Sequence, residues 1–173
     1  MAPAAVGQLI VGRYRLEQCL SQGAQGAVWR ASDQLAAAAP VVLRYLTAPI
    51  DLERAAELWS QLQGVLHPQV PRLGAATRDA DGLWLVREWQ NGRTYQQLLA
   101  LRGERQLVFG AGEVLLLLRQ LLPVLAVLHG QELVHGDLCP ANLLRRDSDG
   151  LPVLLDFGLV CGSAFATPAY APP

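Results

Sequence analysis

The 173-residue chain contains no lysine, and all fourteen of its basic residues are arginine. No chemical step that ordinarily relies on a lysine amine can therefore use one in this protein. Charge is also scarce: only 17% of the residues are charged, and the formal net charge is −1. Such a balance gives no electrostatic attraction to nucleic acid or to an anionic membrane, so neither partner is expected.

Cysteine is rare as well. Cys19, Cys139 and Cys161 are odd in number and far apart, and no CxxC or Cys/His cluster accompanies them. This spacing therefore indicates neither a disulfide framework nor a zinc site. The first residues lack the charged and apolar regions of a signal peptide, so we expect a reduced, cytoplasmic setting.

One long apolar segment is present, at residues 114–128. Arg119, Gln120 and Pro123 interrupt it, and we expect it to fall short of a membrane span. Apolar residues make up 51% of the chain, which indicates a substantial core. The segment is therefore predicted to be a buried helix.

The first ninety residues carry mainly strand patterns. A helix is predicted over residues 52–62, where apolar residues recur at helical spacing and Asp51 is a candidate N-cap. Alternating or compact apolar runs separated by turn residues predict strands around it. These strands are expected at residues 14–20, 27–31, 41–46, 73–77 and 83–89.

The pattern changes after a hinge at residues 91–93. Helices are predicted from residue 94 to 101 and from 112 to 129. Two short apolar strands follow at 143–145 and 153–155, joined by the turn-prone residues 147–150. In an antiparallel hairpin of this kind Asn142 and Asp156 become neighbours, and their oxygens suit a hard cation such as magnesium.

The clearest chemical signal is the run from His135 to Asn142, which reads HGDLCPAN, followed by Asp156-Phe157-Gly158. It supplies an acid, an amide and a second acid at the spacing needed to position a phosphoryl acceptor and to hold magnesium beside a nucleotide. Each motif alone would be a weak signal. Together, in this order, they make phosphotransfer the leading hypothesis.

A glycine-containing turn, residues 21–28, lies between the first two predicted strands. Glycine there lets the backbone approach phosphate oxygens and offer its N–H groups. The pattern departs from a full GxGxxG because Ser21 stands where the first glycine would be. A plain hairpin turn is the alternative interpretation.

With these motifs the chain resembles the eukaryotic-like serine/threonine protein kinases, particularly the bacterial branch, over nearly all of its length. The resemblance implies one α+β domain over residues 1–173, with an N-lobe (1–90) of five antiparallel strands and one helix and an incomplete, mainly helical C-lobe (91–173). The motifs that carry it are residues 21–28, 41–44, Glu57 ahead of His67-Pro68, Glu88-Trp89, 135–142, 156–158 and 167–173.

The resemblance also implies roles for individual residues. Asp137 would be the catalytic carboxylate that orients the acceptor hydroxyl and takes up its proton, and Asn142 and Asp156 would hold magnesium. ATP would be the phosphoryl donor, and the acceptor would be a serine or threonine of an unidentified protein. The residues expected to contact the nucleotide are Leu20, Ser21, Gly23, Gly26, Val28, Val42, Arg44, Glu57, Glu88, Trp89 and Leu144.

Several positions depart from the family pattern. Arg44 stands where the family has a lysine that pairs with the helix glutamate, and Cys139 replaces a second lysine. Gly136 replaces the arginine that receives an activation-loop phosphate in many members. The helices that normally follow Pro173 are absent from the sequence, so the apolar segment 114–128 is expected to be partly uncovered and to offer a surface to a protein partner.

Three functions therefore compete. The first is a Ser/Thr protein kinase domain that is weakened by Arg44, Cys139 and the missing helices. The second is a pseudokinase-like module that binds a nucleotide or a partner without turnover. The third and least favoured is a small-molecule phosphotransferase of the aminoglycoside-kinase type, in which HGDL also occurs but is commonly followed by histidine rather than Cys139.

Overall fold

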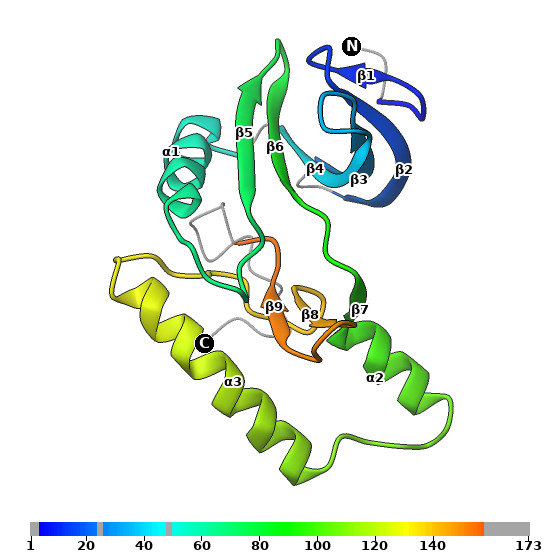
Figure 1. The fold of residues 1–173 in the computed structure, drawn as a ribbon, viewed down its shortest axis with the longest axis vertical. Coiled ribbons are helices and arrows are strands. Elements are labelled where there is room, and N and C mark those ends of the chain that lie inside the picture. Colours follow the sequence, from blue (N-terminus) through cyan, green and yellow to red (C-terminus); the bar gives the residue numbers. More distant parts are fainter. Residues whose placement is uncertain (1–3, 24–25, 48–49, 158–173) are drawn as a thin grey trace. The chain divides into compact units, whose positions relative to one another are not determined.

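The structure, a computed structural model, describes residues 4–23, 26–47 and 50–157 (Figure 1). The chain divides into two compact units. The first contains the chain up to Gly64 together with Arg72–Trp89, and the second contains Val65–Pro71 and the chain from Gln90 onward. The segment Val65–Pro71 thus belongs to the second unit although it lies between two elements of the first.

The first unit is built on an antiparallel sheet, which has six strands within the described residues, in the order β1-β2-β3-β4-β6-β5. The sequence predicted five strands. The additional strand is β1, which is only two residues long and pairs with the start of β2. The strands are β1 (Leu9–Ile10), β2 (Tyr14–Gly23), β3 (Gly26–Asp33), β4 (Ala39–Thr47), β5 (Leu73–Arg78) and β6 (Gly82–Glu88).

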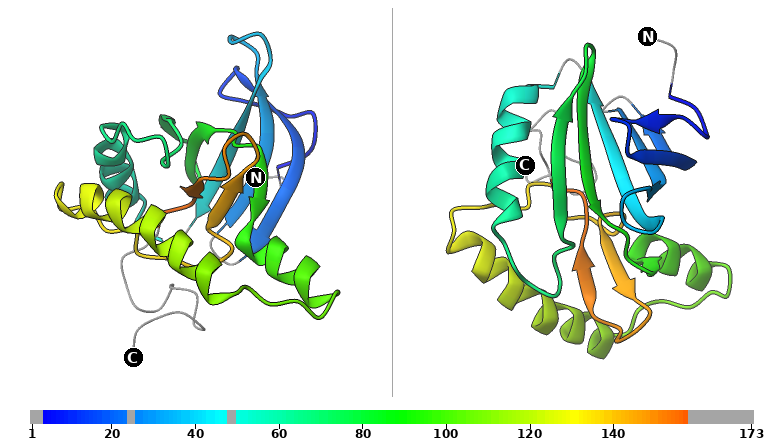
Figure 2. Two further views of the ribbon diagram at one scale, coloured as in Figure 1. Left: turned by 60° about the horizontal axis from the view of Figure 1, so that its bottom comes forward. Right: turned by 45° about the horizontal axis from the view of Figure 1, so that its top comes forward.

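Successive side chains along these strands point to opposite faces of the sheet. One face carries an apolar cluster that includes Tyr14, Trp29, Leu43 and Trp84, all buried. Helix α1 (Leu52–Gln63) packs beside β5, as Figures 1 and 2 show. The expected N-cap is confirmed, because the Asp51 carboxylate accepts the backbone N–H groups of residues 53 and 54.

The second unit contains two helices and a small sheet. The helices are α2 (Tyr95–Gly103) and α3 (Ala111–His129), and the antiparallel sheet has the order β7-β8-β9. Thr94 starts α2 with a capping box to Gln97. The predicted hairpin is confirmed as β8 (Leu143–Arg146) and β9 (Pro152–Leu154), while β7 (Gly92–Thr94) falls where the sequence suggested only a hinge.

Helix α3 corrects one expectation. The sequence predicted a buried helix too short to span a membrane, whereas only Leu121, Val124 and Leu128 of α3 are buried. Among the described residues α3 is also long and apolar enough, by length and composition alone, to cross a membrane. Core helices of globular proteins can have the same length and apolar composition. The apolar surface expected from the resemblance is present: Leu115 and Leu122 are 61% and 60% exposed.

Candidate active site

Two of the predicted site residues are joined by hydrogen bonds in the loop after α3. The amide nitrogen of Asn142 donates to a carboxylate oxygen of Asp137, at 2.8 Å, and to the Asp137 main-chain carbonyl, at 2.9 Å. The backbone N–H of Asn142 donates to the carbonyl of Cys139. The loop thereby folds back on itself, so the carboxylate and the amide lie side by side.

The β8–β9 hairpin brings the third residue to this place. Leu143 pairs with Leu154, and the Leu155 N–H donates to the Asn142 carbonyl at 2.8 Å. Asp156 is therefore one residue beyond the direct partner of Asn142. Its φ of 38° lies in the left-handed region, which aspartate tolerates better than most residues and which often marks a functional position. The register thus brings the backbones of Asn142 and Asp156 to the same end of the hairpin, as the sequence predicted.

His135 supports this arrangement from inside the protein. Its Nδ1 accepts the backbone N–H of Asp137 at 3.3 Å, so Nε2 carries the proton and donates to the Leu155 carbonyl at 2.9 Å. Burial lowers the pKa of His135, which favours this neutral form. The ring also lies 4.7 Å from that of Phe157, which is buried. His135 thus links the loop of Asp137 to the strand end that carries Asp156.

The donor set in this unit fits a magnesium ion. With its amide nitrogen turned to Asp137, Asn142 presents its side-chain oxygen, and Asp156 supplies a carboxylate. Oxygen ligands from one or two carboxylates, completed by water and phosphate, are the usual magnesium environment. Within the described part of the chain no group of three or more His, Cys, Asp or Glu residues could hold a metal alone. The site suits a cation that a phosphate-bearing ligand completes.

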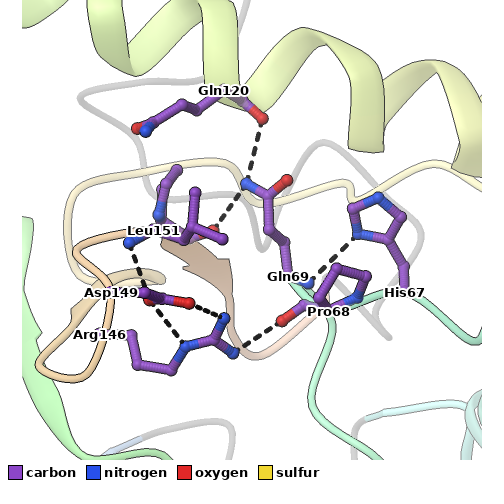
Figure 3. Close-up of polar contacts among 8 residues, drawn as sticks. His67, Pro68, Gln69, Gln120, Arg146, Asp149 and Leu151 are labelled. Carbon is purple, nitrogen blue, oxygen red and sulfur yellow. Dashed lines mark hydrogen bonds and ion pairs between the residues drawn. The ribbon is translucent and has the colours of Figure 1, made fainter.

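Gln69 anchors the segment Val65–Pro71 to the same hairpin, as Figure 3 shows. Its side-chain amide is buried and donates to the carbonyls of Pro152, at 2.8 Å, and of Gln120 in α3, at 3.0 Å. The Leu154 N–H donates to the Gln69 carbonyl. Arg146 adds a bond to the Pro68 carbonyl at 2.8 Å while it grips Asp149 with both ends of its guanidinium.

The remaining predicted residues, except Leu144, lie in the first unit. Val28 and Arg44 are direct partners across β3 and β4, and Val42 lies two residues from Arg44, so the three share one face of the sheet. Val42 is fully buried, whereas Val28 and Arg44 are half-buried. Leu144 lies in β8 of the second unit and is buried.

The glycine-containing turn joins β2 and β3. Gly23 pairs with Gly26, whose φ is 116° and whose α-carbon approaches the Tyr45 carbonyl so closely that an added Cβ would lie 1.7 Å from that oxygen. Only glycine fits there. Ser21 is paired with Val28, and Leu20 lies at a register shift beside it and is exposed. Residues 24 and 25, at the tip of the turn, lie outside the described residues, as do Gly158 and the motif at 167–173.

The predicted helix glutamate and the hinge are placed differently from the simple expectation. Glu57 is exposed and lies two residues from both Ala55 and Trp59, which are buried, so it projects from the opposite side of α1. The α1 acid found in an ion pair is Glu53, 3.6 Å from Arg78. In the hinge, the Glu88 N–H already donates to the Arg72 carbonyl, and the Trp89 ring lies under the Arg30 guanidinium.

Two supporting residues were not among the predicted site residues. His135 was noted only as part of a motif, although a buried histidine beside an acid is a recognisable signal. Gln69 gave no signal, since its two acceptors are 51 and 83 residues away in the sequence. Both act by holding the residues that the motifs name.

Comparison with known proteins agrees with this geometry. Residues 14–169 match the family described as the protein kinase domain. The chain belongs to the protein kinase family. It is 32% identical over 165 residues to serine/threonine-protein kinase C of Synechocystis sp., covering 88% of this chain and 30% of that protein. It is 35% identical over 162 residues to serine/threonine-protein kinase-like protein E of the same organism, covering 91% and 26%.

This kinase domain spans less than a third of the length of those two relatives. Among solved structures, the apo form of PpkA-294 superposes with a TM-score of 0.75 at 18% identity, covering 91% of this chain and 62% of that one. A Rad53 complex with AMP-PNP superposes with a TM-score of 0.74 at 24% identity, covering 87% and 40%. These similarities establish the α+β kinase fold, with a curled N-lobe sheet and part of a C-lobe.

Proposed function

We propose that this domain transfers a phosphoryl group from ATP to serine or threonine hydroxyls of proteins. The observation that carries the proposal is the cluster in the second unit, where the amide of Asn142 holds the Asp137 carboxylate and the hairpin ends with Asp156 one residue beyond the backbone partner of Asn142. Phosphoryl transfer depends mainly on positioning and on charge neutralisation, and this cluster supplies groups for both.

Asp137 is proposed to act on the acceptor. Its carboxylate is half-buried and fixed by Asn142, and the backbone N–H of Asp137 is tied to His135. A carboxylate held in one orientation can accept the hydrogen bond of an incoming hydroxyl and take up its proton. Positioning of this kind provides most of the acceleration in phosphoryl transfer.

Asn142 and Asp156 are proposed as the magnesium ligands. When bound, magnesium neutralises the charge that develops on the phosphate oxygens. The chain contributes an amide oxygen and a carboxylate at the two ends of one hairpin, so their separation is set by the β8–β9 register. The residues of the first unit, including Val28, Val42 and Arg44, remain the predicted contacts for the nucleotide.

A pseudokinase-like function is the second candidate, and specific observations favour it. Cys139, at a position where the family has a lysine, is buried and brings no positive charge. Glu57, the predicted partner of Arg44, is exposed on the side of α1 away from its buried stripe. A small-molecule phosphotransferase has less support, because the matched relatives named here are protein kinases.

The deciding experiment measures nucleotide binding and transfer separately on the full chain. Thermal shift with ATP, with and without magnesium, reports binding, and labelled phosphate incorporation into a generic protein substrate reports transfer. Asp137→Ala should bind ATP normally but lose transfer, while the control Glu104→Gln, which removes an exposed acid, should retain both ATP binding and transfer. Binding without Asp137-dependent transfer would assign the pseudokinase function, and absence of magnesium-dependent binding would refute both proposals.

The cellular setting is part of the proposal. A cytoplasmic location is favoured by cysteines that are free in the described part of the chain, Cys19 and Cys139. No nucleic acid or membrane partner is proposed, because a net charge of −1 does not attract the chain to either polyanion. The exposed apolar stripe of α3 remains the predicted contact for a protein partner.

A further inference from the structure

A small polar pocket lies beside the β7–β8 pair of the second unit. Its volume is about 300 Å³, near the lower end of the range of ligand pockets. It is lined by Arg93, Leu98, Arg145, Arg146, Asp147 and Gly150. Three of these six residues are arginines, so the pocket concentrates positive charge in a chain that has a net charge of −1.

Arg93 and Arg145 are direct partners in the register of β7 and β8. Residues placed opposite each other in an antiparallel pair have Cβ atoms about 5 Å apart, and like charges there destabilise the sheet. Both side chains are exposed, and within the described residues neither forms a hydrogen bond or an ion pair. The fold therefore holds two guanidinium groups close together without a hydrogen-bonded acid among the described residues, and an anion would relieve their repulsion.

The neighbouring charged groups leave this pair available. The guanidinium of Arg146 is already engaged by Asp149 and by the Pro68 carbonyl. Glu113 at the start of α3 is near enough to feel Arg145, but its carboxylate is bound by Arg102 and by the Gly110 N–H, which lower its pKa to about 2. Asp147 is the one acid in the lining, so Arg93, Arg145 and Asp147 together carry one excess positive charge.

The pocket is separate from the residues assigned to catalysis. Arg145 follows Leu144 in β8, and successive side chains of a strand point to opposite faces. The two arginines thus lie on the face of the small sheet opposite to Leu144, the residue predicted to contact the nucleotide base. At the turn of the hairpin, an added Cβ on Gly150 would lie 3.7 Å from the Arg145 Nε, so the guanidinium rests beside this glycine.

We propose that this pocket binds a phosphate-type oxyanion, either free or carried on a phosphorylated side chain of a protein. Planar guanidinium groups match phosphate oxygens with two parallel hydrogen bonds each, and a dianion neutralises both members of the pair. Leu98 of α2 offers an apolar contact for the chain that carries the phosphate. The site would let the domain recognise a protein that is already phosphorylated, independently of nucleotide binding.

The test uses the full chain without nucleotide. A fluorescent phosphoserine peptide, its unphosphorylated counterpart and inorganic phosphate as a competitor are the probes, with anisotropy as the readout. Arg93→Gln and Arg145→Gln should each weaken phosphopeptide binding about tenfold, and the double variant should weaken it further. Asp147→Asn should tighten binding by removing the acid. Arg105→Gln, which removes an exposed arginine of the same unit, should leave the affinity unchanged.

Each outcome decides the proposal. Competition by inorganic phosphate supports a site for the anion itself, whereas phosphopeptide binding that phosphate does not displace, but that is lost in the double variant, assigns the ligand to the peptide-borne group. Equal affinity for both peptides, or equal loss in Arg105→Gln, refutes the proposal. The Arg93→Lys/Arg145→Lys variant keeps the charge and should retain part of the binding, which separates ligand contact from loss of folding. A kinase-inactive domain would still bind, so the result does not depend on turnover.

Discussion

The two units prepare their parts of the proposed site in different ways. In the second unit Asp137, Asn142 and His135 are connected by hydrogen bonds of 2.8 to 3.3 Å, and a hairpin register fixes Asp156. In the first unit Arg44 and Glu57 lie on separate elements, a strand and a helix, and Glu57 is exposed. The residues of the acidic cluster are therefore set by local contacts, whereas a pairing of Arg44 with Glu57 depends on how α1 is rotated about its axis.

The largest expected effect comes from removing a charge at the proposed magnesium site of the second unit. Asp156→Asn keeps the size of the side chain but removes the charge that a magnesium ligand needs. We expect phosphate transfer to fall by about 1,000-fold or more, since the metal neutralises the transferred group. Steady-state transfer at several magnesium concentrations measures this loss.

Asp147→Asn is the matched control for Asp156. It removes the same charge from the turn of the same hairpin, where the side chain is exposed. Its rate of transfer to an unphosphorylated substrate should equal that of the unmodified chain, because Asp147 lines the separate anion pocket and not the proposed catalytic cluster. An Asp156→Asn variant that retains full, magnesium-dependent transfer would contradict the assignment of Asp156 as a ligand.

The next effect tests what holds the hairpin. Gln69→Leu removes a buried amide that donates to two carbonyls, in β9 and in α3. Leaving buried polar groups without partners should lower the free energy of unfolding by about 1–3 kcal/mol. Urea denaturation measures it, and Gln131→Leu, at an exposed position of the same unit, should cost much less. An equal cost for the two variants would show that the anchor contributes nothing.

Much of this organisation could be predicted from the sequence, and the failures share a cause. The strands, α1 and the convergence of Asn142 with Asp156 follow from local periodicity and from a turn, so they were predicted correctly. Strand β1 was missed because two residues carry no periodicity. Composition alone predicted a buried α3, because an apolar composition does not tell what covers a helix; its partial exposure was expected only from the resemblance. Gln69 was missed because its partners are distant in the sequence.

A smaller effect on the transfer rate is expected from a change at Arg44 in the first unit. Arg44→Lys replaces a planar fork with a compact ammonium group on a flexible stem, the residue that the family uses. If the arginine is the main defect, transfer should rise by about three- to tenfold, with little change in stability. Arg54→Lys, an exposed position on α1, is the control and should leave the rate unchanged. A rate that stays constant in Arg44→Lys would place the limit elsewhere, for example at Cys139.

The smallest effect concerns the first unit alone. The Tyr45 hydroxyl donates to Asp79 at 2.9 Å and its ring stacks on Trp84, and burial together with that carboxylate raises its pKa to about 12. A raised pKa in the folded state gives stability that is complete below the unfolded value of about 10 and is lost as the pH rises through 12. Because the chain has no lysine, no amine side chain titrates in that interval.

Urea midpoints measured from pH 9 to 11.5 should therefore decrease, and Tyr45→Phe should make the decrease shallower while it keeps the ring stack. Tyr95→Phe is the matched control in the second unit, where burial alone raises the tyrosine pKa and no carboxylate adds to it. Tyr95→Phe should change the dependence of the urea midpoint on pH less than Tyr45→Phe does. An identical slope in Tyr45→Phe and the unmodified chain would mean that the bond to Asp79 does not contribute to the stability of the first unit.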